Sequence, residues 1–132
     1  PRMAEAIGWR AAAEWLEENI DFNDAHHHIH NIASWMSNEM EKIPGITIFG
    51  APGRDDGVGI VSFLHESILA QDMGYLLDAG GFAIRTGTHC AQPLLEAMGV
   101  ASTNRASIWI YNTMAEAEAF IVHLRDIVDR FA

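Results

Sequence analysis

The chain has 132 residues, nearly half of them apolar, and a formal net charge of −10. This length fits one ordinary globular domain, so residues 1–132 are predicted to form a single domain. The excess of acidic groups argues against nucleic acid or an anionic membrane as the main partner. No apolar run in the sequence is long enough to span a bilayer.

Cysteine and lysine each occur once, as Cys90 and Lys42. A single cysteine excludes an intrachain disulfide and a zinc site of several cysteines, and it suits a reducing cytoplasm. Lys42 lies just before an expected helix end, and its side chain is expected to be in solvent. A lysine that forms a Schiff base needs a desolvated or specifically paired site. Residues 1–3 contain no signal peptide and suggest a chain cut from a longer one. Lysine-based covalent chemistry is therefore not expected from this chain alone.

The first half of the chain is predicted to hold two helices followed by two strands. Residues 4–19 repeat apolar side chains at four-residue spacing, and Asp21 or Asn23 can cap the second helix. Strands are expected at 46–49 and 58–64, joined by a loop at 50–57. The expected inward faces are Ile7, Ala11 and Trp15 in the first helix, and Ile29, Ile32, Ala33, Met36, Met40 and Ile43 in the second. Pro44-Gly45 ends that second helix, and the loop tip Arg54-Asp55-Asp56 is interpreted as a solvated turn.

The second half alternates helices and strands. A helix at 70–79 is ended by two glycines, and a short strand at 82–84 leads to Arg85. A short helix begins near Pro93, because proline is tolerated in a first helical turn. A loop at 99–104 and a strand at 106–111 follow. Thr113 and Glu116 form a capping box for a last helix with the apolar stripe Phe120, Ile121, Leu124, Ile127, Val128 and Phe131.

This order of elements predicts an α+β fold. Helices before, between and after about four short strands favour one small sheet covered by helices on one face. The connections at 50–57 and 99–104 are too short for most crossovers, so the sheet is expected to be mostly antiparallel.

One stretch, from Phe82 to Pro93, concentrates the reactive side chains. Arg85, His89 and Cys90 lie within six residues of a strand-to-helix loop. Nearby positive charge favours a thiolate, so this loop is a candidate reactive-cysteine site. The alternative is a small buried cysteine beside a hydrogen-bonded histidine. On local chemistry alone both interpretations stay open.

Arg105 opens the predicted fourth strand just as Arg85 closes the third. If these strands are antiparallel neighbours, both guanidinium groups reach the same edge of the sheet. A planar guanidinium binds a carboxylate through two hydrogen bonds, so the pair could hold a carboxylate substrate. The alternative is that each arginine pairs with one of the eighteen acidic residues.

Four histidines cluster in the second helix, at His26, His27, His28 and His30. His26 and His30 lie one turn apart, a spacing that can hold Zn²⁺ or Ni²⁺. No nearby carboxylate or cysteine clearly supplies a third ligand, and the cluster lies on the polar side of the helix. A solvated histidine face is the better interpretation, and no metal site is predicted.

The string RTGTHCAQPL, followed by RASIWIYNT and a capped last helix, resembles the C-terminal small domain of group II cysteine desulfurases. These enzymes belong to the fold-type I, pyridoxal-phosphate-dependent class V aminotransferase family. The resemblance extends over nearly the whole chain, from IGWRAAAEWL through IPGITIFG and GIVSF to RDIVDRF. One departure lies beside the cysteine, because Thr88 stands where the family usually has histidine.

The resemblance assigns roles to the four site residues. Cys90 corresponds to the nucleophile that takes sulfur as a persulfide, and Arg105 to the residue that binds the substrate α-carboxylate. Arg85 corresponds to an arginine that structures the active-site loop. His89 lies beside the nucleophile and is expected to contribute local polarity rather than catalysis.

At the level of the whole protein, the resemblance implies a homodimer that converts L-cysteine to L-alanine and passes sulfur to an acceptor protein for iron–sulfur cluster assembly. Pyridoxal phosphate is its cofactor, and the lysine that holds it belongs to a large domain that this chain lacks. The isolated chain is therefore expected to be inactive. Two alternatives remain: a selenocysteine lyase, which acts on L-selenocysteine, and a non-catalytic module that binds a partner protein.

Overall fold

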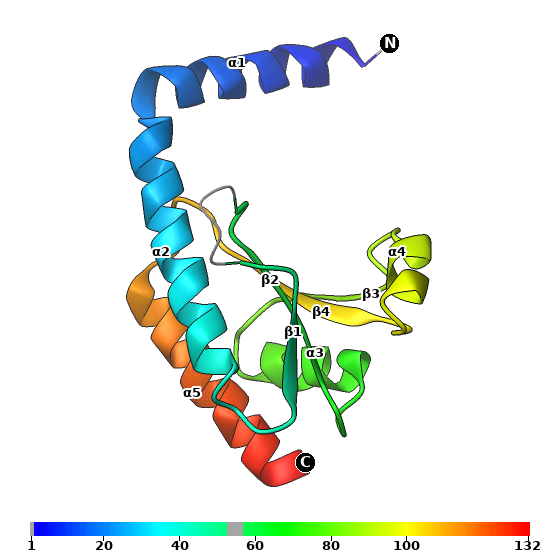
Figure 1. Ribbon diagram of the computed structural model, residues 1–132. Helices are drawn as coiled ribbons and strands as arrows, with labels where there is room; N and C mark the ends of the chain where they lie inside the picture. The colour runs from blue at the N-terminus through cyan, green and yellow to red at the C-terminus, as the bar shows by residue number, and fades with distance from the viewer. Residues whose placement is uncertain (1, 53–56) are drawn as a thin grey trace.

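A computed structural model describes residues 2–52 and 57–132 of the chain. Within these residues it shows five helices and one four-stranded sheet, as the α+β prediction required (Figure 1). The predicted charged turn at residues 54–56 lies outside the described residues. In chain order the elements are α1 (Met3–Asn19), α2 (Phe22–Met40), β1 (Ile46–Phe49), β2 (Ile60–His65), α3 (Ala70–Ala79), β3 (Arg85–Gly87), α4 (Gln92–Ala97), β4 (Thr103–Ser107) and α5 (Met114–Phe131).

The sheet has the strand order β1-β2-β4-β3, and every neighbouring pair is antiparallel. Side chains alternate between the two faces of a strand, so the register sorts residues by face. One row across the sheet joins Phe63 of β2 to Asn104 of β4 and Thr86 of β3. The adjacent row joins Ser62, Arg105 and Arg85 on the opposite face. Neighbouring residues of β4 therefore serve two different surfaces.

Helices α2, α3 and α5 cover the face that carries Phe63. Helix α2 lies against β1 and β2, α3 lies against β3 and β4, and α5 packs on both helices. Alternate residues of β2 are buried, as expected for a strand with one covered face. The largest fully buried side chains are Phe63, Met40, Met73, Leu77, Ile121, Leu124, Val61 and Asn104. The other face, which carries the two arginines, is left open.

Two predicted caps set the starts of the long helices. Asp21, rather than Asn23, caps α2, because its Oδ1 accepts hydrogen bonds from the backbone N–H groups of Asn23 and Asp24 at 2.8 and 3.2 Å. Thr113 and Glu116 form the predicted capping box of α5. The Thr113 N–H donates to Glu116 Oε2 at 2.7 Å, and the Glu116 N–H donates to Thr113 Oγ1 at 3.2 Å. Both caps satisfy backbone donors that a helix start leaves unpaired.

Three strand boundaries predicted from the sequence are wrong. The third strand is Arg85–Gly87 rather than 82–84, and the fourth is Thr103–Ser107 rather than 106–111. The second is Ile60–His65 rather than 58–64. The sequence-based boundaries followed apolar runs, but a strand extends only as far as its neighbour supplies hydrogen-bond partners. Residues 82–84 are all apolar, yet they lie beyond the part of β4 that pairs with β3.

Helix α1 is where predicted, but its predicted inward face is wrong. None of its residues is buried, and Trp9 is 80% exposed. Figure 1 shows α1 meeting the start of α2 at a steep angle and extending across the top of the view, apart from the sheet and the other helices. Ile7 and Trp15 therefore face solvent, because nothing in the described chain packs against this helix. No helix among the described residues is long and apolar enough to cross a membrane.

Candidate active site on the open face of the sheet

The two arginines singled out by the sequence lie directly opposite each other. Arg85 begins β3 and pairs with Arg105 in the middle of β4. Within the described residues neither guanidinium takes part in an ion pair, although acidic groups outnumber basic ones by more than two to one. The Nε of Arg105 is buried and has no hydrogen-bond partner there. The alternative in which each arginine is neutralised by a surface acid does not hold in this structure.

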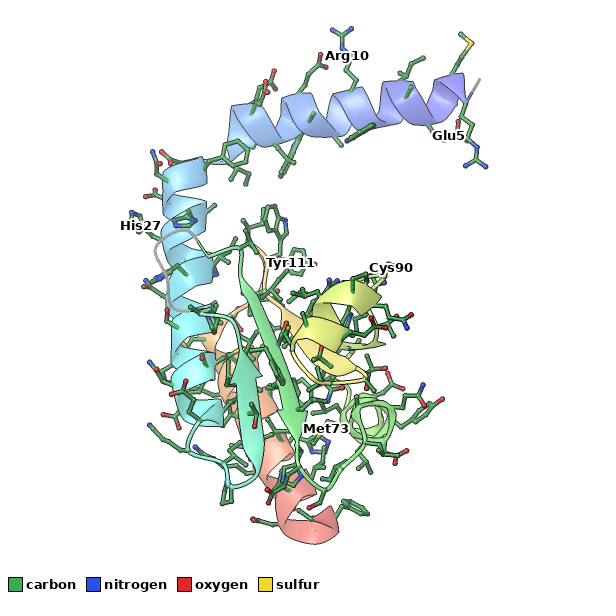
Figure 2. All side chains as sticks on the ribbon, turned by 45° about the vertical axis from the view of Figure 1, so that its right-hand side comes forward. Glu5, Arg10, His27, Met73, Cys90 and Tyr111 are labelled. Carbon is green, nitrogen blue, oxygen red and sulfur yellow. The ribbon has the colours of Figure 1, made fainter. Side chains whose placement is uncertain are left out.

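Cys90 lies beside this pair. Gly87 ends β3 with a φ of 114°, and the chain then turns over residues 88–91, closed by a hydrogen bond of 2.9 Å from the Ala91 N–H to the Thr88 carbonyl. The Cys90 side chain is exposed, and the Nη2 of Arg85 approaches its Sγ to 3.9 Å. Figure 2 shows Cys90 at the outside of the fold, well away from the buried Met73. Cys90 is thus not the small buried cysteine of the alternative interpretation.

The cysteine turn has an unusual backbone. His89 and Cys90 have φ angles of 55° and 57°, the left-handed region that side chains with a Cβ disfavour. Within the described residues they are the two non-glycine positions with positive φ. Such a conformation costs about 1–3 kcal/mol at each residue and persists only where the surroundings impose it. Backbone strain therefore coincides with the reactive side chain.

His89 reaches from this turn to β4. Its Nε2 lies 2.9 Å from the carbonyl oxygen of Thr103. A carbonyl can only accept, so Nε2 carries the hydrogen and donates it. The Nδ1 of the same ring is buried without a partner among the described residues. The half-buried histidine thus makes one polar contact, and that contact ties the cysteine turn to the strand that bears Arg105.

The histidine cluster of α2 lies along one stretch of the helix, from His26 to His30. Among residues 2–52 and 57–132, no group of three or more metal-binding side chains could hold an ion. The rings of His26 and His30 stack with centroids 6.2 Å apart. His28 instead has a structural contact that the sequence did not predict, because its Nε2 donates to the Asn112 carbonyl at 2.8 Å. This bond connects α2 to the segment that precedes α5.

Asn104 is the main residue that the sequence-based interpretation missed. It was assigned to a loop, but it lies inside β4 with no exposed surface, and within the described residues neither its amide nitrogen nor its amide oxygen has a hydrogen-bond partner. The signal was present in the strand period, because a residue next to an outward-facing Arg105 must face the core. An asparagine there was not expected, since buried polar groups are normally hydrogen-bonded.

A separate hollow of about 230 Å³ lies on the helix-covered side of the molecule. It is lined mainly by apolar side chains, among them Ile32, Phe82 and Phe120. None of the four predicted site residues lines it. The reactive groups therefore lie outside this hollow.

Comparison with known proteins gives this surface its context. The model of the aminotransferase class-V family matches residues 1–120. A probable cysteine desulfurase of Staphylococcus epidermidis is 35% identical over 132 residues, which are all of this chain and 32% of that protein. A cysteine desulfurase of Haloferax volcanii is 36% identical over 121 residues, 92% of this chain and 28% of that protein. The chain thus spans about a third of the length of these relatives.

The fold agrees with solved cysteine desulfurases. The crystal structure of the Escherichia coli cysteine desulfurase CsdA in its S-sulfonic acid form superposes with a TM-score of 0.91 and 32% identity, over all of this chain and 32% of that one. The apo cysteine desulfurase of Thermococcus onnurineus NA1 also has a TM-score of 0.91, with 25% identity over 98% of this chain and 32% of that one. The chain belongs to the class-V aminotransferase family and matches the C-terminal small domain of its cysteine desulfurases.

Proposed function

We propose that this chain is the small domain of a pyridoxal-phosphate-dependent cysteine desulfurase, which converts L-cysteine to L-alanine and leaves the sulfur on Cys90 as a persulfide. The observation that carries the proposal is an exposed Cys90 thiol 3.9 Å from the guanidinium of Arg85. Arg105 lies opposite Arg85 on the neighbouring strand, and neither arginine makes an ion pair among the described residues. A small substrate with a carboxylate at one end and a sulfur at the other fits this combination of groups.

Cys90 is the proposed sulfur acceptor. Its thiolate attacks the sulfur of the substrate, a new S–S bond forms, and the C–S bond of the substrate breaks. The electron pair of the C–S bond stays on the substrate carbon, and a proton then completes alanine. The Arg85 guanidinium lies 3.9 Å from this Sγ and places positive charge beside the reacting sulfur.

Arg105 is the proposed carboxylate ligand. Its guanidinium makes no ion pair within residues 2–52 and 57–132, so it gives up no existing pair when a carboxylate arrives. Two parallel N–H···O bonds would fix the orientation of the substrate as well as bind it. Arg85, on the neighbouring strand, is closer to the sulfur end, so the two arginines have different tasks.

The residues of this chain do not fit the cofactor itself. Lys42 is exposed and pairs with Glu39 at 2.5 Å, next to β1 at the edge of the sheet opposite β3. It therefore lacks both the desolvation and the position that a cofactor lysine needs. In this proposal the remaining two thirds of the protein hold pyridoxal phosphate, which supplies an electron sink for the substrate carbon. This chain supplies the acceptor thiol and the carboxylate ligand.

The exposure of Cys90 also suits delivery of the sulfur. A persulfide at an outer loop is accessible to the thiol of an acceptor protein, in keeping with a role in iron–sulfur cluster assembly. A reducing cytoplasm would keep Cys90 free between turnovers. Homodimerisation, as in the family resemblance, is part of the same proposal for the longer protein.

The proposal is tested in the longer protein that contains this chain. Cys90→Ser should abolish transfer of sulfur from cysteine to an acceptor thiol, while the visible absorbance of the bound cofactor stays unchanged. His27→Ala, an exposed histidine outside the site, is the matched control. Cysteine turnover by Cys90→Ser at the wild-type rate would exclude Cys90 as the acceptor. Retained selenocysteine turnover in that variant would favour a selenocysteine lyase instead.

A further inference from the structure

The cysteine turn needs something to hold it. Two consecutive non-glycine residues, His89 and Cys90, occupy the left-handed region, and each would relax to an extended or right-handed helical conformation if released. The loop's own hydrogen bond, from the Ala91 N–H to the Thr88 carbonyl, closes the turn without reaching the sheet. Another contact must therefore fix where the turn lies relative to the two arginines.

His89 provides such a contact. Its Nε2–H donates to the Thr103 carbonyl at 2.9 Å, two residues before Arg105 on the same strand. Because its Nδ1 has no partner among the described residues, this single bond is the whole polar attachment of the ring. The histidine next to the thiol is thus attached to the strand of the proposed carboxylate ligand.

The geometry points to His89 as a positioning residue, which anchors the left-handed turn to β4 and thereby keeps the Cys90 thiol beside Arg85 on the open face of the sheet. The inference rests on the proposed role of Cys90 as sulfur acceptor. It goes beyond the expectation that His89 supplies only local polarity. The anchor fixes the place of Sγ relative to Arg85 and Arg105, and so the span between the sulfur and carboxylate ends of a bound substrate.

The test uses two alkylating reagents on the 132-residue chain, in which Cys90 is the sole thiol. Iodoacetate carries a carboxylate and iodoacetamide is neutral, but both react with the same thiolate. The ratio of their rate constants therefore cancels changes in the amount of thiolate and reports positive charge near Sγ. A guanidinium about 4 Å away in a water-like medium should raise this ratio about fivefold.

Five variants separate the anchor from other roles. Arg85→Gln should lower the ratio, which shows that it reports the neighbouring guanidinium. His89→Ala should lower it to a similar degree, and His89→Gly should do the same although glycine accepts positive φ without strain. His89→Gln, which places an amide N–H at a similar reach, should restore part of it. His28→Ala is the matched control, because it removes an equivalent Nε2–carbonyl bond far from Cys90 in the chain.

The outcomes are decisive in both directions. A wild-type rate ratio in folded His89→Ala would exclude His89 as the anchor of the turn. A wild-type rate ratio in His89→Gly alone would mean that the turn needs a residue that accepts positive φ, and not the hydrogen bond of His89. Circular dichroism of each variant checks that it is folded. In the longer enzyme, His89→Ala should lower kcat with KM for cysteine within about twofold, since Arg105 still binds the carboxylate. If Cys90→Ser kept full cysteine turnover while the alkylation ratio still depended on His89, the proposed function would fail and the anchor would stand.

Discussion

A polar group without a partner has different consequences on the two faces of the sheet. Two neighbouring residues of β4, Asn104 and Arg105, illustrate the difference. Asn104 points into the helix-covered core, where neither amide atom has a hydrogen-bond partner among the described residues. Arg105 points to the open face, where its buried Nε is also unpartnered. Asn104 is fully buried, so a substrate cannot reach it and its missing hydrogen bonds lower stability. The guanidinium of Arg105 lies on the face that carries Arg85, where in the proposed function a carboxylate pairs with it and gains affinity.

This comparison makes a general expectation for the chain. Substitutions on the covered face should change the free energy of unfolding and spare the chemistry. Substitutions on the open face should change the chemistry and nearly spare the stability. Substitutions of surface groups that already form ion pairs should have the smallest effects on both stability and chemistry.

The largest effect is expected on the covered face, from Phe63→Ala. Phe63 has no exposed surface and lies in the row of β2 that faces the helices. Removing a buried ring of this kind typically costs about 3–5 kcal/mol, from lost burial and the cavity left behind. Urea unfolding of the 132-residue chain measures this loss. Leu64→Ala, one residue along on the open face, should cost less than half as much, and an equal loss would break the distinction between the faces.

Next in size is Arg105→Ala in the longer enzyme. Losing the proposed hydrogen-bonded ion pair between Arg105 and the substrate carboxylate leaves a buried charge without its partner. This typically costs about 2–5 kcal/mol, or roughly a 30- to 5,000-fold fall in kcat/KM for cysteine. Arg105→Lys should recover part of the loss, because an ammonium group offers a point charge rather than a planar fork. Steady-state kinetics measures both variants. A kcat/KM within a few-fold of wild type would remove the carboxylate role from Arg105.

A smaller effect of opposite sign is expected for Asn104→Leu. The change removes two buried, unpartnered polar atoms and puts apolar surface in their place. The chain should gain about 1–3 kcal/mol in its free energy of unfolding. Asn38→Leu on the exposed side of α2 is the control and should stay within about 0.5 kcal/mol of wild type. A destabilised Asn104→Leu chain would mean that the amide is satisfied in solution, for example by an ordered water.

The smallest effect belongs to Glu39, a polar group whose partners are already in place. Hydrogen bonds from Lys42 at 2.5 Å and from Arg125 of α5 at 2.6 Å hold the pKa of Glu39 below its ordinary value of 4.5. A carboxyl group with a lowered folded-state pKa contributes stability that is complete above the unfolded-state pKa and is lost as the pH falls through the folded one. Glu39→Gln should therefore lower the melting temperature slightly at pH 7.

The pH dependence is what distinguishes this ion pair from a general charge effect. The difference between Glu39→Gln and wild type should shrink as the pH falls below 4.5. Glu41→Gln removes a charge from the same helix end without breaking a described ion pair, and it should show no such trend. Thermal melts at several pH values decide the matter, and a difference that persisted at acid pH would exclude the linkage.

Much of the chemistry could be predicted from the sequence because it is local. The spacing of Arg85, His89 and Cys90 places three reactive groups in one loop whatever the exact strand ends. The placement of Arg85 and Arg105 beside each other was also predicted, since antiparallel neighbours bring the end of one strand beside the start of the next. The structure pairs the two residues, although Arg85 begins β3. The strand ends themselves did not follow, because apolar runs such as 82–84 continue beyond the hydrogen-bond partners that β4 supplies.

The limits of the sequence lie in contacts between distant segments. Nothing in the residues around His89 indicates that its ring would reach the Thr103 carbonyl, or that His28 would reach Asn112. Asn104 was placed at the end of the predicted loop 99–104, whereas the pairing with β2 and β3 puts it inside β4. Each of these features depends on a partner that is remote along the chain.

The sequence by itself determined the helices, their caps, the antiparallel α+β class and the reactive loop, because these depend on residue spacing and on bonds between near neighbours. Only the tertiary structure decided which apolar helix face is covered and which polar group is left without a partner. α1 and α5 are both rich in apolar side chains, yet α5 buries six of them and α1 buries none (Figure 1). Burial is a property of what packs against a residue, and an amino-acid pattern can specify a surface without supplying the one that covers it.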